Sequence, residues 1–171
     1  MTEQVNGSRG QRAAKRLGSL DRLDQAILAA LAEDGRISIT ELASRIGLSK
    51  SPTQARLRRL EMTGIIMGYR ALLDPISLGL DHVAFVEVRL SDTREAALRA
   101  FNAAVQHLPE VEQAHMIASH FDYLLKVRTR NMAHYRQFLG DVISGLPHVA
   151  STSTYVAMEA VKEVMLPGLD P

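Results

Sequence analysis

Basic, amide and hydroxyl side chains gather in one short stretch of the sequence, residues 50–59. Glutamine can hydrogen-bond adenine through two atoms, arginine can do the same with guanine, and serine or threonine can contact bases or phosphates. The stretch therefore predicts a surface that binds double-stranded DNA, with an ordinary solvated helix face as the alternative. Which arginine would reach a base and which would hold only phosphate stays open. The predicted DNA-binding residues are Lys50, Ser51, Thr53, Gln54, Arg56, Arg58 and Arg59.

Catalytic chemistry has little support in the sequence. The chain has no cysteine, which excludes thiol catalysis, disulfides and thiolate metal ligands. No metal-binding histidine spacing, nucleotide-binding glycine motif or hydrolase serine motif is present. We therefore expect no enzyme, no catalytic residue, no metal site and no cofactor. The histidines are expected to be scattered surface residues or hydrogen-bonded ones: His82, His107, His115, His120, His134 and His148.

Charge is distributed unevenly along the chain. Residues 1–70 carry 12 Lys and Arg against 7 Asp and Glu, whereas residues 71–171 carry 8 against 12. Only the first half is therefore expected to meet a polyanion, although chance could produce the same imbalance. No apolar run approaches the roughly 20 residues that span a bilayer. The polar, basic N-terminus also lacks the apolar core of a signal peptide, so we expect a cytoplasmic protein without membrane contact.

Three short helices are expected to carry the basic stretch. Asp21 is the predicted N-cap of the first helix. The second helix is predicted to begin at a capping box, in which Ser38 caps an amide three residues on and Glu41 reaches back. Gly47 is predicted to end it. A second helix and a third joined by a tight turn form a helix-turn-helix, the motif that places a helix in the major groove.

The third of these helices carries the predicted DNA-binding residues. A second capping box at residues 51–54 predicts its start, with Pro52 at the first helical position, where a missing N–H costs nothing. The helix is expected to run to about Met62, and Gly64 is expected to end it. Its two leucines are expected to face the core: Leu57 and Leu60.

The second half of the chain alternates between strand-like and helix-like segments. The order is β-α-β-β-α-β, which is the ferredoxin-like arrangement. Two helices would cover one face of the sheet, and the uncovered face suggests burial against another subunit. The predicted strands are residues 82–90, 111–119, 121–129 and 150–158, and the predicted helices are residues 95–108 and 131–146.

The pattern divides the chain into five segments. Residues 1–19 have almost nothing to bury and are expected to be a disordered basic tail, which either touches DNA phosphates or is simply solvated. The dipeptide Asp74-Pro75 breaks the pattern after the helices. The other segments are a helix-turn-helix domain at residues 20–73, a linker at 74–81, an assembly domain at 82–164 and a C-terminal tail at 165–171.

Many short motifs arrive in a recognisable order. They are Leu23-Asp24, Asp34-Gly35-Arg36-Ile37-Ser38, Glu41-Leu42-Ala43, Ile46-Gly47-Leu48-Ser49, Arg56-Leu57-Arg58-Arg59-Leu60-Glu61, Gly64-Ile65-Ile66, Phe121-Asp122-Tyr123-Leu124-Leu125-Lys126 and Thr154-Tyr155-Val156-Ala157-Met158. Together they resemble the leucine-responsive regulatory protein/AsnC (feast/famine) family of transcription regulators, and most closely its leucine-responsive branch. The resemblance covers residues 20–164, nearly the whole chain.

The resemblance implies an α+β fold, with an N-terminal winged helix-turn-helix domain followed by a C-terminal ferredoxin-like βαββαβ domain. It implies homodimers built through the sheets and often octamers of four dimers. It also implies a small amino acid bound between dimers as the effector, which shifts DNA binding or assembly. The effector-binding positions carried over from the family are Met116, Ile117, Ser119, His120, Asp122, Met132, Tyr155, Val156 and Ala157.

One departure from the family bears on this site. The family usually has Gly-Asp immediately before the aromatic-Asp pair, where this chain has Ser119-His120. A histidine, neutral or positive near pH 7, would not pair well with the amino group of a ligand. The ligand sits differently, the ligand is a different one, or the site no longer senses. Asp122 could equally cap the strand turn, and Tyr155 is expected to lie partly in the core.

Two other functions remain as alternatives to a transcription regulator. Siroheme decarboxylases resemble this two-domain fold and use histidines, so a tetrapyrrole-processing enzyme is one. An assembly module that binds no DNA is the other. The arginine-rich third helix favours the regulator, since neither alternative needs it.

Overall fold

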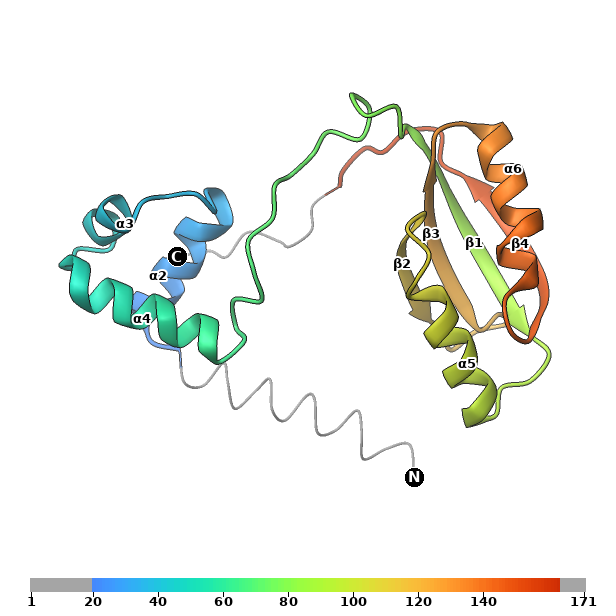
Figure 1. Ribbon diagram of the computed structural model, residues 1–171, viewed down its shortest axis with the longest axis horizontal. Helices are drawn as coiled ribbons and strands as arrows, with labels where there is room; N and C mark the ends of the chain where they lie inside the picture. Colours follow the sequence, from blue (N-terminus) through green and yellow to red (C-terminus); the bar gives the residue numbers. More distant parts are fainter. Residues whose placement is uncertain (1–19, 164–171) are drawn as a thin grey trace. The chain divides into compact units, whose positions relative to one another are not determined.

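The computed structural model describes residues 20–163, which fall into two units, residues 20–72 and 73–163. Figure 1 labels their helices and strands. The predicted tails at residues 1–19 and 165–171 lie outside the described residues.

The first unit consists of three helices whose starts are set by local capping. Asp21 caps the first of them: its carboxylate accepts from the backbone N–H of Asp24 at 2.9 Å, and the Asp24 carboxylate accepts from the N–H of Asp21 at 3.2 Å. Ser38 caps the second by accepting from the N–H of Glu41 at 3.2 Å. Both predicted N-caps are confirmed, but Glu41 makes no return hydrogen bond to Ser38, so only half of the predicted capping box forms. The helices are α2 (Arg22–Glu33), α3 (Ile39–Arg45) and α4 (Lys50–Met62) (Figure 1).

The start of α4 differs from the prediction. Its N-cap is Ser49, whose side chain makes no capping hydrogen bond, so the capping box predicted at residues 51–54 is wrong. Pro52 is consequently the third helical residue and not the first. The first four N–H groups of a helix have no partner within it, so proline is tolerated at either position. Proline in the first turn therefore does not by itself fix where a helix begins.

The three helices bury a small apolar core. Ile27 of α2, Leu42 of α3 and Leu60 of α4 are almost completely inaccessible, and Leu57 packs against them. Gly47 follows α3 with a φ of +70°, the left-handed conformation that glycine adopts without steric cost at the end of a helix. Between α4 and residue 81 the described chain contains turns but no strand.

The second unit contains a four-stranded antiparallel sheet in the order β2-β3-β1-β4, as the predicted β-α-β-β-α-β arrangement requires. The predicted order is confirmed, and β1 has the predicted bounds, but the other five elements are shorter than predicted. β2 ends at Met116, and α6 ends at Asp141, just after Gly140, which disfavours the helix interior. The elements are β1 (His82–Leu90), α5 (Glu95–Val105), β2 (Val111–Met116), β3 (Tyr123–Thr129), α6 (Met132–Asp141), the 3-10 turn η1 (Ile143–Gly145) and β4 (Val149–Val156).

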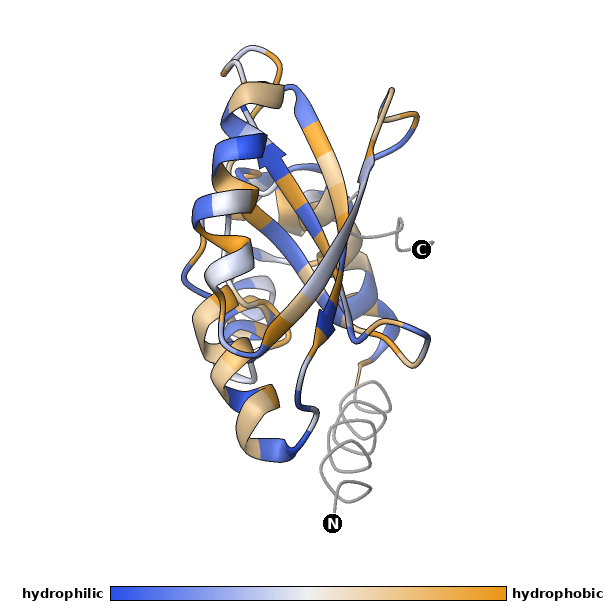
Figure 2. Ribbon diagram, turned by 90° about the vertical axis from the view of Figure 1, so that its right-hand side faces the viewer, coloured by the Kyte–Doolittle hydropathy of each residue, from blue (hydrophilic) through white to orange (hydrophobic). Residues whose placement is uncertain are grey.

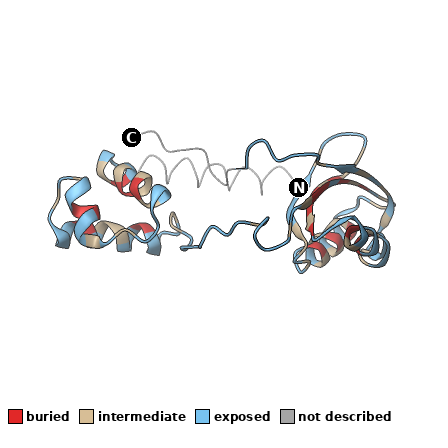
Figure 3. Ribbon diagram, turned by 90° about the horizontal axis from the view of Figure 1, so that it is seen from above, coloured by how far each residue is buried: buried red, intermediate tan, exposed pale blue. Residues whose placement is uncertain are grey.

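Both helices of this unit cover the same face of the sheet (Figures 1 and 2). Alternate residues of β1 point into the layer between the sheet and the two helices, and Val86 and Val88 are fully buried there. They pack with Phe101 of α5 and with Tyr135 and Phe138 of α6. Figure 3 shows the buried residues where helices and sheet meet.

The opposite face, here called the open face, has no helix over it among the described residues. Phe85 of β1 lies directly opposite Tyr155 of β4, and their exposed fractions are 36% and 55%. The expectation that Tyr155 lies partly in the core is therefore wrong. Successive strand residues alternate between faces, and Thr154, not Tyr155, points toward the helices and hydrogen-bonds Tyr135.

The packing of α4 generates a stability prediction. Leu60→Ala should lower the free energy of unfolding of the helical unit by about 2–5 kcal/mol, because it removes a buried side chain and leaves a cavity. Met62→Ala is the matched control, since Met62 lies on the same helix and is 82% exposed. We expect that variant to stay within about 0.5 kcal/mol of wild type in urea unfolding. Equal losses in both variants would contradict the placement of α4.

Candidate nucleic-acid interface and ligand site

One face of α4 is accessible along its length. Ser51, Gln54 and Arg58 are all exposed, and their spacing places them in one line along the helix. We call these three residues the α4 stripe. Lys50, also exposed, begins the helix beside it. Within the described residues neither Lys50 nor Arg58 forms an ion pair, so both positive charges are available to an anionic partner.

Thr53 cannot belong to the accessible surface. It is completely buried, and its hydroxyl donates to the backbone carbonyl of Ser49 at 2.9 Å. A threonine hydroxyl commonly satisfies itself in this way within a helix. Burial therefore removes Thr53 from the predicted set of DNA-binding residues.

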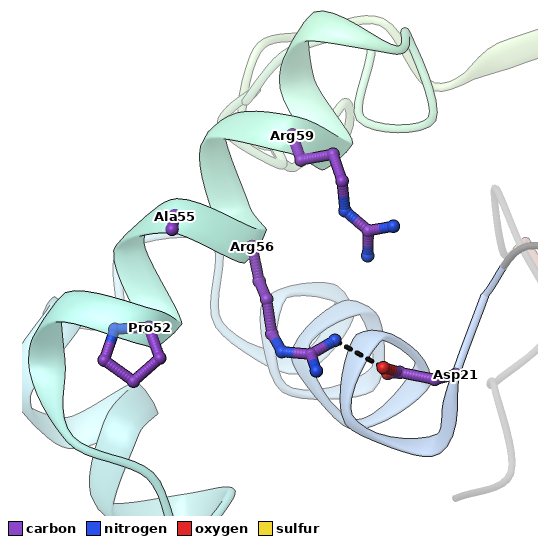
Figure 4. Close-up of a pocket in the computed structure, with 5 residues that line it drawn as sticks. All are labelled: Asp21, Pro52, Ala55, Arg56 and Arg59. Carbon is purple, nitrogen blue, oxygen red and sulfur yellow. Dashed lines mark hydrogen bonds and ion pairs between the residues drawn. The ribbon is translucent and has the colours of Figure 1, made fainter.

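The other two arginines of α4 are engaged within the unit. Arg56 donates to the Asp21 carboxylate at 2.6 Å and to the Asp24 carboxylate at 2.9 Å, and Arg59 hydrogen-bonds the second oxygen of Asp24. We call these four residues the carboxylate–arginine cluster. Arg56, Arg59 and Asp21, with Pro52 and Ala55, line an open hollow beside the helix (Figure 4).

The electrostatics of the cluster are dominated by Asp24. Its side chain is only 1% exposed, whereas those of Arg56 and Arg59 are 27% and 45% exposed. Burial raises the pKa of the Asp24 carboxyl, but hydrogen bonds from Arg59 and Arg56 outweigh it and leave that pKa below the ordinary value. Hydrogen bonds from the Asp24 backbone and from Arg56 likewise lower the pKa of Asp21. The cluster therefore stays ionised at neutral pH.

This cluster was not predicted from the sequence, although a signal was present. Asp24 lies three residues before Ile27 and seven before Leu31, on the apolar stripe of α2. A carboxylate at an inward-facing position needs a cation or several donors, because an isolated buried charge is very costly. In the structure Arg56 and Arg59 of α4 supply these cations.

The first group of predicted effector residues lies in and around the loop between β2 and β3. Ser119 and His120 are exposed and hydrogen-bond each other at 3.1 Å. Nε2 of His120 lies 3.7 Å from a carboxylate oxygen of Glu87, on the open face. The carboxylate of Asp122 accepts from the backbone N–H of Leu90 at 2.7 Å, so it ties the loop to the end of β1.

The second group lies elsewhere in the unit. Met132 begins α6, and Ala157 follows β4 and donates to the carbonyl of Val83, near the start of β1. Asp122 pairs near the other end of β1, at Val88. Met116 and Tyr155 are on the two opposite edge strands, three strand spacings or about 14 Å apart across the sheet. One subunit therefore does not bring the two groups together around a single amino acid.

The described residues contain no group of three or more histidine, aspartate or glutamate side chains that could hold a metal ion. Of the helices between residues 20 and 163, none is both long and apolar enough to cross a bilayer.

Both units match families of known proteins. Residues 20–67 match the winged helix-turn-helix DNA-binding family, and residues 83–167 match the Lrp/AsnC ligand binding domain. The proline dehydrogenase transcriptional activator of Rhodobacter capsulatus is 57% identical over 150 residues, which are 88% of this chain and 97% of that protein. The chain belongs to the Lrp/AsnC family of transcription regulators.

Other members of the Lrp/AsnC family support the same assignment. The leucine-responsive regulatory protein of Salmonella typhimurium is 48% identical to this regulator over 144 residues, 84% of this chain and 88% of that protein. The crystal structure of a Neisseria meningitidis transcriptional regulator in complex with L-methionine superimposes with a TM-score of 0.81 at 33% identity. The superposition covers 87% of this chain and 97% of the other. The expected fold and family are thus confirmed.

The lowered pKa of Asp24 generates a pH prediction. Because the pKa lies below its ordinary value of 3.8 in the folded state, the cluster stabilises the fold fully above that value. The stabilisation is lost as the pH falls through the lowered pKa. We expect the difference in unfolding free energy between wild type and Asp24→Asn to shrink in this acidic range, measured by urea unfolding. Asp81→Asn, which alters an exposed carboxylate, should show no such trend, and a constant difference for Asp24→Asn would contradict the ion pairing.

Proposed function

We propose that this regulator reads operator DNA through the α4 stripe, with Lys50 beside it. The observation that carries the proposal is the division of charge on α4. Arg56 and Arg59 are ion-paired with carboxylates. Ser51, Gln54 and Arg58 are exposed and contact no carboxylate among the described residues. A glutamine and an arginine one turn apart match the donors and acceptors of successive bases in the major groove. Arg56 and Arg59 would lie at the flank of this surface, where the carboxylates of Asp21 and Asp24 neutralise them.

We also propose that the regulator acts as a homodimer or a larger homo-oligomer assembled through the open face. Phe85 and Tyr155 are exposed there on neighbouring strands, and aromatic residues are enriched at protein interfaces. The separation of the two groups of effector residues supports the same proposal. A site containing both Met116 and Tyr155 requires residues from more than one subunit.

A small amino acid is the proposed effector. This proposal rests on the ligand binding domain that residues 83–167 match and on the L-methionine complex of a structural relative. Relatives at 57% and 58% identity are named as transcriptional activators of proline dehydrogenase. We therefore propose genes of amino-acid catabolism as targets, with proline beside leucine and methionine as effectors to test.

We propose that the chain is not an enzyme. The histidine chemistry of a tetrapyrrole-processing enzyme would need histidines that converge, whereas His107 lies after α5 and His120 lies in the β2–β3 loop. A purified protein that is colourless and takes up no added tetrapyrrole is the expected result. Tight uptake of a tetrapyrrole would contradict this proposal without bearing on DNA binding.

The DNA proposal is tested by removing one charge from the α4 stripe. Arg58→Gln should weaken binding to DNA from the upstream region of the regulator's own gene. If Arg58 holds a phosphate, the salt slope should also fall by about one, as expected when a single phosphate is no longer neutralised. Fluorescence anisotropy at several salt concentrations measures both. Arg136→Gln removes an equivalent charge from the exposed surface of α6 and should change neither value. Unchanged affinity and slope in Arg58→Gln would contradict the proposed reading surface.

The same titration, repeated with proline, leucine or methionine at fixed salt, tests the effector proposal. A shift in the binding midpoint with one amino acid identifies the effector and shows that a site with Ser119-His120 still senses. Sedimentation velocity with the same amino acids measures any change in assembly. If none of the three shifts the binding midpoint or the sedimentation coefficient, these amino acids are excluded as effectors.

The oligomer proposal predicts the effect of a charge on the open face. Phe85→Asp should shift the protein toward monomers in sedimentation velocity, because the shared face would bring two unpaired carboxylates into a desolvated interface. Gln137→Asp places the same charge on the exposed side of α6 and should leave the mass unchanged. A Phe85→Asp variant with the wild-type mass would show that the subunits assemble elsewhere.

A further inference from the structure

Asp24 occupies a position where folding alone favours an apolar side chain. It lies on the inward stripe of α2 with Ile27 and is fully buried. A buried ion pair is often no more stable than a well-packed apolar replacement, because desolvation of the charges offsets their attraction. The carboxylate at this position therefore points to a role in addition to stability.

The geometry of the contacts indicates what that role is. The two oxygens of Asp24 receive two different arginines, Arg56 on one oxygen and Arg59 on the other. These arginines are three residues apart on α4 and reach the carboxylate from the same side of the helix. The backbone N–H of Asp21 donates to Asp24 as well, so the carboxylate itself is fixed to the start of α2. Rotation of α4 about its own axis would break at least one of these contacts.

We propose that Asp24 is a positioning residue for DNA recognition. By holding Arg56 and Arg59, it sets the rotation of α4 and leaves the reading of sequence to Ser51, Gln54 and Arg58. Without Asp24 the two guanidinium groups are free to bind any phosphate, which maintains or strengthens binding to unrelated DNA while the stripe loses its register. The inference rests on the proposed DNA binding by α4.

Asp21 offers a matched control within the same cluster. Its carboxylate also binds Arg56, but its side chain is 51% exposed and it makes no ion pair with Arg59. Asp21→Asn therefore removes the same charge from the same cluster while keeping the buried contact between α2 and α4. If only the total charge of the cluster matters, Asp21→Asn and Asp24→Asn will behave alike.

The test measures the affinity of the full-length chain for DNA from its own upstream region and for unrelated DNA of the same length. The quantity of interest is the ratio of these two affinities, and the salt slope of each affinity is measured as well. All measurements are made at a temperature where circular dichroism shows every variant folded. For Asp24→Asn we expect the ratio to fall at least tenfold. The affinity for unrelated DNA should be unchanged or higher, with a salt slope no shallower than that of wild type. Asp21→Asn should keep the wild-type ratio.

Several outcomes would overturn the inference. One is a folded Asp24→Asn variant whose ratio equals that of wild type, and another is an equal fall in the Asp21→Asn variant. Equal losses of affinity for both DNAs would assign Asp24 a purely structural role. If wild type itself does not distinguish the two DNAs, the proposed function fails and the inference fails with it. If wild type distinguishes the two DNAs and Asp24→Asn keeps the wild-type ratio, the inference alone is overturned.

A second variant decides the matter if Asp24→Asn does not fold. Arg56→Lys keeps a cation beside the buried carboxylate but replaces the planar guanidinium by a flexible ammonium. The ratio should fall by severalfold while the affinity for unrelated DNA and its salt slope stay at the wild-type values. An unchanged ratio in this variant would overturn the positioning role.

Discussion

A charged carboxylate buried between two helices needs cations or hydrogen-bond donors to offset the cost of its desolvation, and this constraint organises the DNA-binding unit. Asp24 is compensated by two arginines from the helix that would otherwise present its whole basic surface to solvent. The number of arginines on α4 therefore overstates the positive charge available to DNA. What remains accessible is a narrower surface, of which Ser51, Gln54 and Arg58 form the centre. The ion-paired arginines and the unpaired residues of the α4 stripe thus lie on different sides of one short helix.

The second unit follows from a different constraint, the alternation of side chains along a strand. Residues of β1 with even numbers from Ala84 to Val88 fill the layer beneath α5 and α6, and the residues between them lie on the open face. Phe85 on that face pairs across the strands with Tyr155. The two-residue alternation along β1 therefore supplies both a buried core and an exposed aromatic surface.

The sequence was informative wherever the cause of a structure is local. The caps at Asp21 and Ser38 and the order of strands and helices were predictable because capping and hydrophobic periodicity act within a few residues. The start of α4 was misplaced because Ser49 and Ser51 both resemble N-caps, and Pro52 is tolerated after either.

The remaining features depend on contacts between distant parts of the chain. The pairing of Arg56 with Asp24 joins residues 32 positions apart, and no spacing rule reveals it. The face on which Tyr155 lies depends on the register with β1, which strand propensity does not encode. The motif resemblance supplied the effector positions as a set to consider, but it could not reveal that Met116 and Tyr155 lie on opposite edges of the sheet. That fact comes only from the strand order.

The strand order has a consequence for how such a regulator would respond in a cell. If an effector site exists only where two subunits meet, the number of sites is set by mass action and not by the number of chains. Binding of the effector and assembly of the subunits are then thermodynamically linked, so the effector promotes assembly and assembly promotes binding of the effector. The amino acid concentration at half response would fall as the regulator becomes more abundant. Any control over the synthesis of the protein would at the same time be control over its threshold.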